Sequence, residues 1–343
     1  MGYFNLESAV INSRYIRLPF LQINWIVIAF VFVFITIIVL DRIKFGKMLI
    51  PGYILILSLL LLLLIFGERW GGSRRWFSTP IGGFQPSEFV KPFIIILYSY
   101  LYSHATDSSS ISLLTVVLTS PVVVLIILEP DFGTSMVFVF TFLIYYLMAE
   151  KKKKRLFFFF AMAIILALLL FSFGLKPYQK ERITAFLDPS KNPDTYYHTQ
   201  QSITMVASGG LLGKGYQRGL GNLYGYIPAD HTDFVLAVFA EEEGFLGMLL
   251  FYTLWFVFFA INISIIHTKK GMKKWLSVGV FATFLIQFTI NVGMVIGILP
   301  VTGLPLPFFT YGGSSTVSNA ILIGIIMWSS LNDDKRLEVL SSR

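Results

Sequence analysis

The sequence predicts an all-α protein, a polytopic bundle of transmembrane helices. Hydrophobic residues make up 55% of its 343 residues and charged residues only 13%, an excess that a soluble domain of this length cannot bury. The apolar residues form about nine runs of bilayer length. Open strands cannot cross lipid, because their backbone groups would be unpaired there. We therefore predict one membrane domain, residues 1–343, with a long extracytoplasmic loop at about 176–243.

Each predicted span is an apolar run long enough to cross the hydrocarbon core as a helix. In chain order the runs are 23–40, 48–67, 86–104, 112–128, 133–149, 156–175, 244–266, 275–298 and 315–331. Residues 1–22 lack an uninterrupted apolar core, so the sequence predicts no cleavable signal peptide there.

Short basic loops predict the orientation. Under this count they all fall on one side: Arg42, Lys44 and Lys47; Lys151 to Arg155; Lys269, Lys270, Lys273 and Lys274. Such loops stay in the cytoplasm. The polar segments 68–85, 129–132, 176–243 and 299–313 are then expected on the opposite, extracytoplasmic face of the membrane.

Composition excludes several classes of function. The chain has no cysteine, which rules out disulfides and thiolate metal sites, and its four histidines form no helical metal pair. No metal site is predicted from protein ligands, and a cation could only be an oxygen-bound divalent ion such as Mg²⁺ or Mn²⁺. The net charge of +8 lies in loops next to apolar runs, where topology and lipid headgroups explain it without nucleic acid.

Asp233 is the candidate centre of function. It follows His231 and Thr232 and precedes the apolar run 234–240, which the acids Glu241 to Glu243 close. A carboxylate where a polar loop meets a membrane-length apolar segment is costly and indicates a function. We expect partial desolvation to raise the pKa of Asp233 toward the range of a general base.

Two further groups of charged residues could bind an anion. In residues 68–77, arginines alternate with tryptophans, which suits an anionic headgroup beside an aromatic shelf or, alternatively, a basic and aromatic membrane belt. In QPSEFVKP, Glu88 and Lys91 share one helix face three residues apart. This pair is expected to line an internal cavity or to fix helix packing as a salt bridge.

Two loops leave their roles open. Glu129 and Asp131 flank a proline, as either a functional acidic turn or an N-cap for the next helix. SGGLLGKG at 208–215 is one residue short of a Walker loop and lacks its hydroxyl residue. Its amides and Lys214 could approach a phosphate, or its glycines could break a re-entrant helix.

Several motifs in order make the chain similar to the SEDS family of bacterial cell-wall synthesis, which includes RodA, FtsW and SpoVE. They are GGSRRW at 71–76, QPSEFVKP at 85–92, EPDFGTS at 129–135, YQKERITAFLDP at 178–189, QS followed by SGGLLGKG within 201–215, HTDF at 231–234, EEEGFLG at 241–247 and NVGMVIGILPVTGLPLPFFTYGGSS at 291–315. SGG and VTGLPLPF resemble the RodA branch more than the FtsW branch. The family usually has ten helices, one more than predicted here.

The resemblance implies a peptidoglycan glycosyltransferase that polymerises lipid II during elongation or division, with undecaprenyl pyrophosphate as the leaving group. Asp233 would then deprotonate the acceptor hydroxyl. Arg75, Lys91 and Lys214 would neutralise the pyrophosphate, Trp76 would hold a sugar or the lipid, and Glu88 would position Lys91. The matching motifs add these substrate contacts: Gln201, Ser208 and His231.

Two other functions are compatible with a membrane bundle of this kind. One is a lipid II flippase, although transport needs charges reachable from both faces and the non-topogenic charges here are predicted outside. The other is an inactive scaffold of a wall-synthesis complex. The resemblance also implies a class B penicillin-binding protein as partner, besides membrane lipids.

Overall fold

The computed structural model describes residues 1–10, 16–70, 73–79, 82–105, 108–150, 177–223 and 233–331. The helices are α1 (Gly2–Ala9), α2 (Leu18–Arg42), α3 (Phe45–Phe66), α4 (Pro86–His104), α5 (Ser108–Leu128), α6 (Phe132–Ala149), α8 (Pro177–Leu187), α9 (Pro193–Ser208), α10 (Leu220–Leu223), α11 (Val235–Thr268), α12 (Gly271–Val295) and α13 (Gly313–Ser330), with a 3₁₀ turn η2 (Pro189–Lys191). The strands are β1 (Glu68–Trp70), β2 (Ser73–Thr79) and β3 (Gly82–Phe84).

The predicted helical membrane bundle is confirmed. In the described part of the chain, α2, α3, α5, α6, α11 and α12 are long and apolar enough to cross a membrane. The helices α4 and α13 coincide with two more predicted spans and carry more polar side chains. The predicted span 156–175 and the basic run 151–155 lie outside the described residues.

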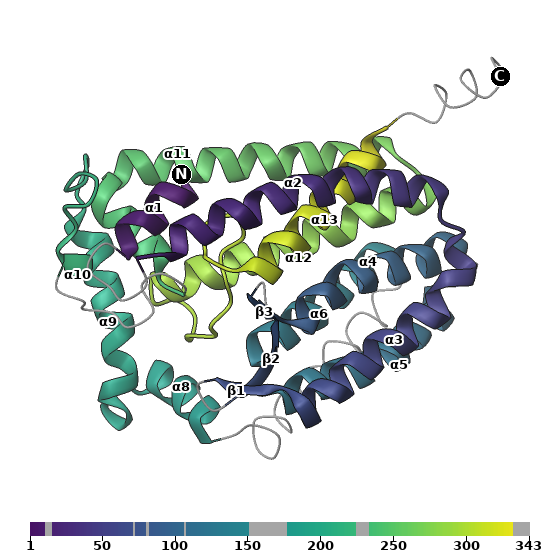
Figure 1. The fold of residues 1–343 in the computed structure, drawn as a ribbon, viewed down its shortest axis with the longest axis horizontal. Coiled ribbons are helices and arrows are strands. Elements are labelled where there is room, and N and C mark those ends of the chain that lie inside the picture. Colours follow the sequence, from purple (N-terminus) through teal and green to yellow (C-terminus); the bar gives the residue numbers. More distant parts are fainter. Residues whose placement is uncertain are drawn as a thin grey trace.

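The helix α12 forms the centre of the bundle. It packs against α4, α6, α11 and α13, while α2 lies along α13, and α3 contacts α4 and α5 (Figure 1). Its most apolar window is 78% buried, against 17% for α2 and α3. The central helix therefore packs against protein, whereas the peripheral helices turn most of their apolar side chains outward.

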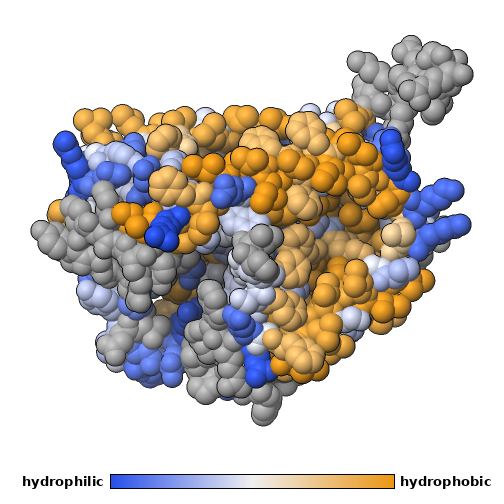
Figure 2. Space-filling model, viewed as in Figure 1, coloured by the Kyte–Doolittle hydropathy of each residue, from blue (hydrophilic) through white to orange (hydrophobic). Residues whose placement is uncertain are grey.

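The exposed apolar surface fits a lipid environment. Apolar side chains cover α11, α2 and α3 in a broad continuous area, and polar side chains gather toward both ends of the bundle (Figure 2). Such an area is far larger than the apolar patches that soluble monomers expose. The molecule is a membrane protein whose long helices run between two polar ends.

One polar end, which we call the basic end, carries the loops 42–45 and 268–271 and the end of α13. Asp41 accepts a hydrogen bond from the Trp328 indole at 3.4 Å, and Lys273 lies over the same ring. Lys269 and Lys273 both donate to the carbonyl of Leu331. Two of the three predicted basic loops therefore share one end, as the sequence analysis expects.

The opposite end, which we call the site end, contains a small antiparallel sheet that the sequence analysis did not predict. The strand order is β1-β2-β3, with Trp70 paired to Ser73 and Phe77 paired to Phe84. Contacts to neighbouring helices hold it: Arg74 donates to the Leu64 carbonyl at the end of α3. The strands are short and charged and show no alternating hydrophobic pattern, so in the sequence they resemble a loop.

Candidate active site

Asp233 lies at the site end, two residues before α11 begins at Val235. The Asn291 amide of α12 donates to the Asp233 carbonyl at 3.2 Å and to the Leu304 carbonyl at 2.8 Å. Asn291 is fully buried. One side chain of the central helix therefore joins the Asp233 backbone to the proline-rich loop 296–312.

Arg182 of α8 meets Asp233 across the backbone of Gly303. Gly303 has φ +74°, and a side-chain carbon there would lie 3.4 Å from Asp233 Oδ2 and 3.8 Å from Arg182 Nη1. Arg182 also donates to the Val301 carbonyl at 3.4 Å. Because Gly303 has no side chain, the carboxylate and the guanidinium can share one small space.

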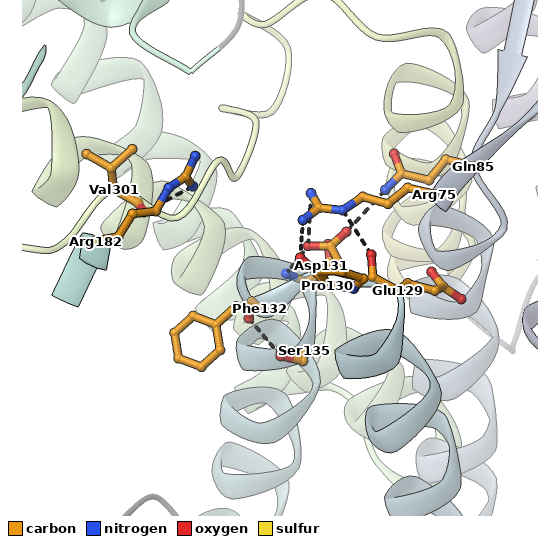
Figure 3. A network of polar contacts seen from close by, with 10 residues as sticks. Arg75, Gln85, Glu129, Pro130, Asp131, Phe132, Ser135, Arg182 and Val301 are labelled. Carbon is orange, nitrogen blue, oxygen red and sulfur yellow. Dashed lines mark hydrogen bonds and ion pairs between the residues drawn. The ribbon is translucent and has the colours of Figure 1, made fainter. Parts of the chain in front are cut away.

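Arg75 of β2 approaches the same region from the other side (Figure 3). Its guanidinium donates to the carbonyls of Glu129 and Pro130 and lies 3.8 Å from Asp131 Oδ1. Asp131 caps α6 by accepting the Thr134 amide at 3.1 Å, as the N-cap interpretation of this turn predicts. The acidic turn therefore holds Arg75 at the edge of the site.

A pocket at the site end brings Arg75 and Arg182 together. Arg75, Pro130 and Phe132 line it on one side, Gln179 and Arg182 on the other, and the loop 300–302 forms the third wall. Figure 3 shows Arg75 and Arg182 on opposite sides of this region. Two guanidinium groups can hold an anionic leaving group. The Asp233 carboxylate, which lies near Arg182 at Gly303, can accept a proton from a nucleophile.

Glu129, in the turn that holds Arg75, is a buried acid. Its side chain is fully buried, and neither carboxyl oxygen has a hydrogen-bond partner. Burial, with a smaller contribution from the Asp131 charge, raises the pKa of Glu129 to about 9. The group is therefore a neutral acid at pH 7.

A divalent cation stays a prediction. Among the described residues no three acidic or histidine side chains form a group that could hold a metal ion. The Asp131 oxygens already accept from Thr134 and Gln85 and face Arg75.

Replacing Glu129 by Gln is expected to remove a pH dependence of stability. The folded chain keeps the Glu129 proton up to about pH 9, whereas the unfolded chain loses it above about 4.5. Between these values the unfolded state binds fewer protons, so stability falls as pH rises, by at most about 1.4 kcal/mol per pH unit. In detergent, the thermal unfolding midpoint should fall less between pH 6 and pH 8.5 for Glu129→Gln than for the wild type. Glu181→Gln, at an exposed acid, is the control and should behave like the wild type. If the midpoints of wild type and Glu129→Gln change in parallel with pH, the prediction is wrong.

Glu88 and Lys91 form a buried ion pair in α4. Lys91 Nζ lies 2.7 Å from Glu88 Oε2, and their side chains are 1% and 2% exposed. Ser318 of α13 donates to the Glu88 carbonyl at 2.7 Å. Neither residue lines the pocket of Arg75 and Arg182. In this arrangement the pair lies within the helix packing, and contact of Lys91 with pyrophosphate stays a prediction.

Ser208 and Lys214 both bind Glu241 of α11. Lys214 Nζ lies 2.6 Å from Glu241 Oε1, and Ser208 donates to the same oxygen at 3.3 Å. The amides of Leu220 and Gly221 also donate to this buried carboxylate. These residues therefore have structural partners here, and their predicted contact with substrate stays untested.

The remaining predicted residues lie apart from the pocket or outside the described chain. Trp76 follows Arg75 on β2, so the two side chains point to opposite faces, and its ring lies over Gly83. Gln201 is half-buried on α9, whose Ser202 donates to the Val295 carbonyl. His231 lies outside the described residues.

Sequence analysis missed Arg182, Gln179 and Thr302 as site residues. All three line the pocket. Arg182 and Gln179 belong to the YQKERITAFLDP motif and are three positions apart, so they share a helix face. That spacing was the available signal, but nothing in the sequence places α8 beside Asp233.

The chain is similar in sequence to known proteins. A family model described as "Cell cycle protein", covering FtsW, RodA and SpoVE, matches residues 6–335. The chain is 33% identical over 296 residues to the putative peptidoglycan glycosyltransferase FtsW of Mesostigma viride, which covers 84% of this chain and 70% of that protein. It is 30% identical over 279 residues to the peptidoglycan glycosyltransferase MrdB of Escherichia coli K12, with 80% and 75% covered.

Solved structures share the fold. One, described as a peptidoglycan synthase complex that coordinates polymerization and crosslinking, has a chain 26% identical to this one. The match has a TM-score of 0.77 and covers 96% of this chain and 95% of that one. The rod shape determining protein RodA of Thermus thermophilus is 25% identical, with a TM-score of 0.67 and coverage of 95% and 91%.

Proposed function

This chain belongs to the FtsW, RodA and SpoVE family of cell cycle proteins, and on that premise we propose that it is a peptidoglycan glycosyltransferase. Its substrate is lipid II, a disaccharide-pentapeptide on undecaprenyl pyrophosphate, and its product is a glycan strand. The observation that carries the proposal is the approach of Asp233 and Arg182 to one another at Gly303, with Arg75 in the adjoining pocket.

Asp233 acts as the general base. Its carboxylate takes the proton of the acceptor sugar 4-hydroxyl while that oxygen attacks the anomeric carbon of the donor. The new glycosidic bond forms with inversion, and the bond to the lipid diphosphate breaks. Asn291 and the loop 296–312 support this role by holding the Asp233 backbone in a fixed position.

Arg182 and Arg75 hold the departing diphosphate. The electron pair of the broken bond passes to a phosphate oxygen, and two guanidinium groups can bind the developing charge with paired hydrogen bonds. The acidic turn at 129–131 positions Arg75 through backbone carbonyls. A neutral Glu129 favours this arrangement, because a second carboxylate charge beside Arg75 would weaken its hold on an anion.

The site faces the outside of a bacterial cell membrane under this proposal. The loops rich in lysine and arginine lie at the basic end, opposite Asp233, and such loops remain in the cytoplasm. A crosslinking partner completes the function. One similar solved chain comes from a synthase complex that couples polymerization to crosslinking, which supports a class B penicillin-binding protein as the partner here.

Reconstitution with fluorescent lipid II tests the function. The purified chain and its penicillin-binding partner in liposomes should produce a ladder of glycan polymers that lysozyme digests. Movement of lipid II across the bilayer without polymer would indicate a flippase, and the absence of both activities would indicate a scaffold. Either result would overturn the proposal.

A further inference from the structure

The glycine-leucine loop, residues 209–215, lies against a break in α11. Gly244 interrupts the helix with φ 63° and ψ −162°. An added Cβ at Gly213 would overlap the Glu242 carbonyl, so only glycine allows the loop to approach this closely. The loop and the break therefore form one interlocked unit.

The backbone groups at the break are paired with this loop. Lys214 and Gly215 donate their amides to the carbonyls of Glu241 and Glu242 at 3.0 and 2.9 Å. In return, the amides of Phe245 and Leu246 donate to Gly210 and Leu211 at 2.8 and 3.1 Å. Irregular backbone survives at membrane depth only where protein or water satisfies such groups, and here protein does.

The loop exposes two large apolar side chains on the surface of the protein. Leu211 and Leu212 are 71% and 78% exposed. The hydrogen bond from Leu246 places Leu211 beside the exposed apolar side chains of α11, namely Phe245, Leu246, Leu249 and Leu250. Because α11 is a candidate membrane span, this surface continues a face that lipid already covers.

The depth of the break agrees with a position at the membrane interface. From Gly244 to Thr268 the helix extends about 37 Å at about 1.5 Å per residue. The hydrocarbon core is about 30 Å thick and the bilayer with headgroups about 40–45 Å. With the end at Lys269 among the headgroups on one side, Gly244 reaches the boundary between headgroups and hydrocarbon on the other. Glu243 is exposed at the break, which fits this boundary and excludes the bilayer centre.

The charge in the loop is neutralised within the protein. Lys214 is the single charged residue in residues 208–216, and its ammonium group binds the buried Glu241 carboxylate. The tip that carries the two leucines is thus free of charge.

We propose that the glycine-leucine loop is inserted into the lipid at the site end, with Leu211 and Leu212 at the edge of the hydrocarbon. The loop anchors α11 in the membrane at the break, which lies seven residues after Ala237. This anchor fixes how deep in the membrane the segment that begins at Asp233 lies. The occupant of this apolar surface is lipid, not a partner protein or a second copy of the chain.

Single cysteines in this cysteine-free chain test the proposal. Leu211→Cys and Leu212→Cys, labelled with the environment-sensitive dye NBD, are placed in phosphatidylethanolamine and phosphatidylglycerol liposomes. Leu249→Cys is the lipid-facing control and the exposed Ser190→Cys the aqueous control. We expect blue-shifted emission at 211 and 212, strong quenching by lipids with a doxyl group at carbon 5, weaker quenching at carbon 12, and several-fold less iodide quenching than at 190.

Two outcomes overturn the proposal. Iodide quenching at 211 and 212 equal to that at 190 would place the loop in water. Protection from both iodide and doxyl lipids would show that protein covers it. Both leucines are exposed, so these variants should fold, and unchanged thermal unfolding midpoints verify this. The readout does not use polymerization, so its failure is separate from a failure of the proposed enzyme activity.

Discussion

Asp233→Asn is expected to abolish lipid II polymerization in the purified complex. The amide keeps the size and hydrogen bonding of the carboxylate but cannot accept the acceptor proton, and loss of a general base typically lowers the rate about 10²–10⁴-fold. Initial rates of polymer formation with fluorescent lipid II measure the effect. Expression, partner binding and lipid II binding should stay near wild type, because the Asp233 backbone carbonyl bound by Asn291 is unchanged.

Asp188→Asn provides the matched control for this substitution. Asp188 is an exposed aspartate before η2, where Ser190 and Lys191 hold its pKa below the usual value. Its removal should leave polymerization intact. If Asp233→Asn polymerizes lipid II within a few-fold of the wild type, the general base is another residue and the site has been misassigned.

Arg182→Ala is expected to lower kcat about 10²–10³-fold, the usual effect of removing one group that stabilises developing negative charge. Arg182→Lys should recover part of this rate, because a single ammonium keeps the charge but loses the two-pronged contact with phosphate. The readouts are kcat and KM for lipid II. A change in KM alone would mean that Arg182 binds ground-state and transition-state substrate equally.

Lys191→Ala removes the same charge from the neighbouring η2 and serves as the control. Lys191 is exposed and pairs with Asp188 at 3.2 Å, apart from the pocket residues. Its substitution should change neither constant. If Arg182→Ala and Lys191→Ala behave alike, Arg182 does not touch the leaving group, and Arg75 alone carries that proposal.

The eight described membrane-length helices could be predicted from the sequence because each is an apolar run that must pair its own backbone in lipid. The apolar run 234–240 after Asp233 was visible in the sequence, but the predicted span began only at 244, whereas α11 begins at Val235 and continues through the break at Gly244. The N-cap at Asp131 could also be predicted, because capping depends on residues three apart. These features rest on local chemistry.

The pocket could not be predicted in the same way. Arg75 and Arg182 line it from a sheet and a short helix that are 107 positions apart in the sequence. Asp233 lies 51 positions after Arg182, and the two approach one another only because Gly303 has no side chain. The glycine-leucine loop shows the same limit. Its composition left open whether its amides and Lys214 approach a phosphate or its glycines break a re-entrant helix. In the structure its amides pair with the broken α11.

The sequence by itself therefore determined the membrane class, the helices, the family and the identity of Asp233 as the candidate base, because hydropathy and motifs are properties of neighbouring residues. Only the tertiary structure decided which cations approach that base. It paired Lys214 with Glu241 and brought Arg182 to Asp233. The physical reason is that a buried charge requires a partner within a few ångströms, and helix packing, not sequence distance, selects that partner.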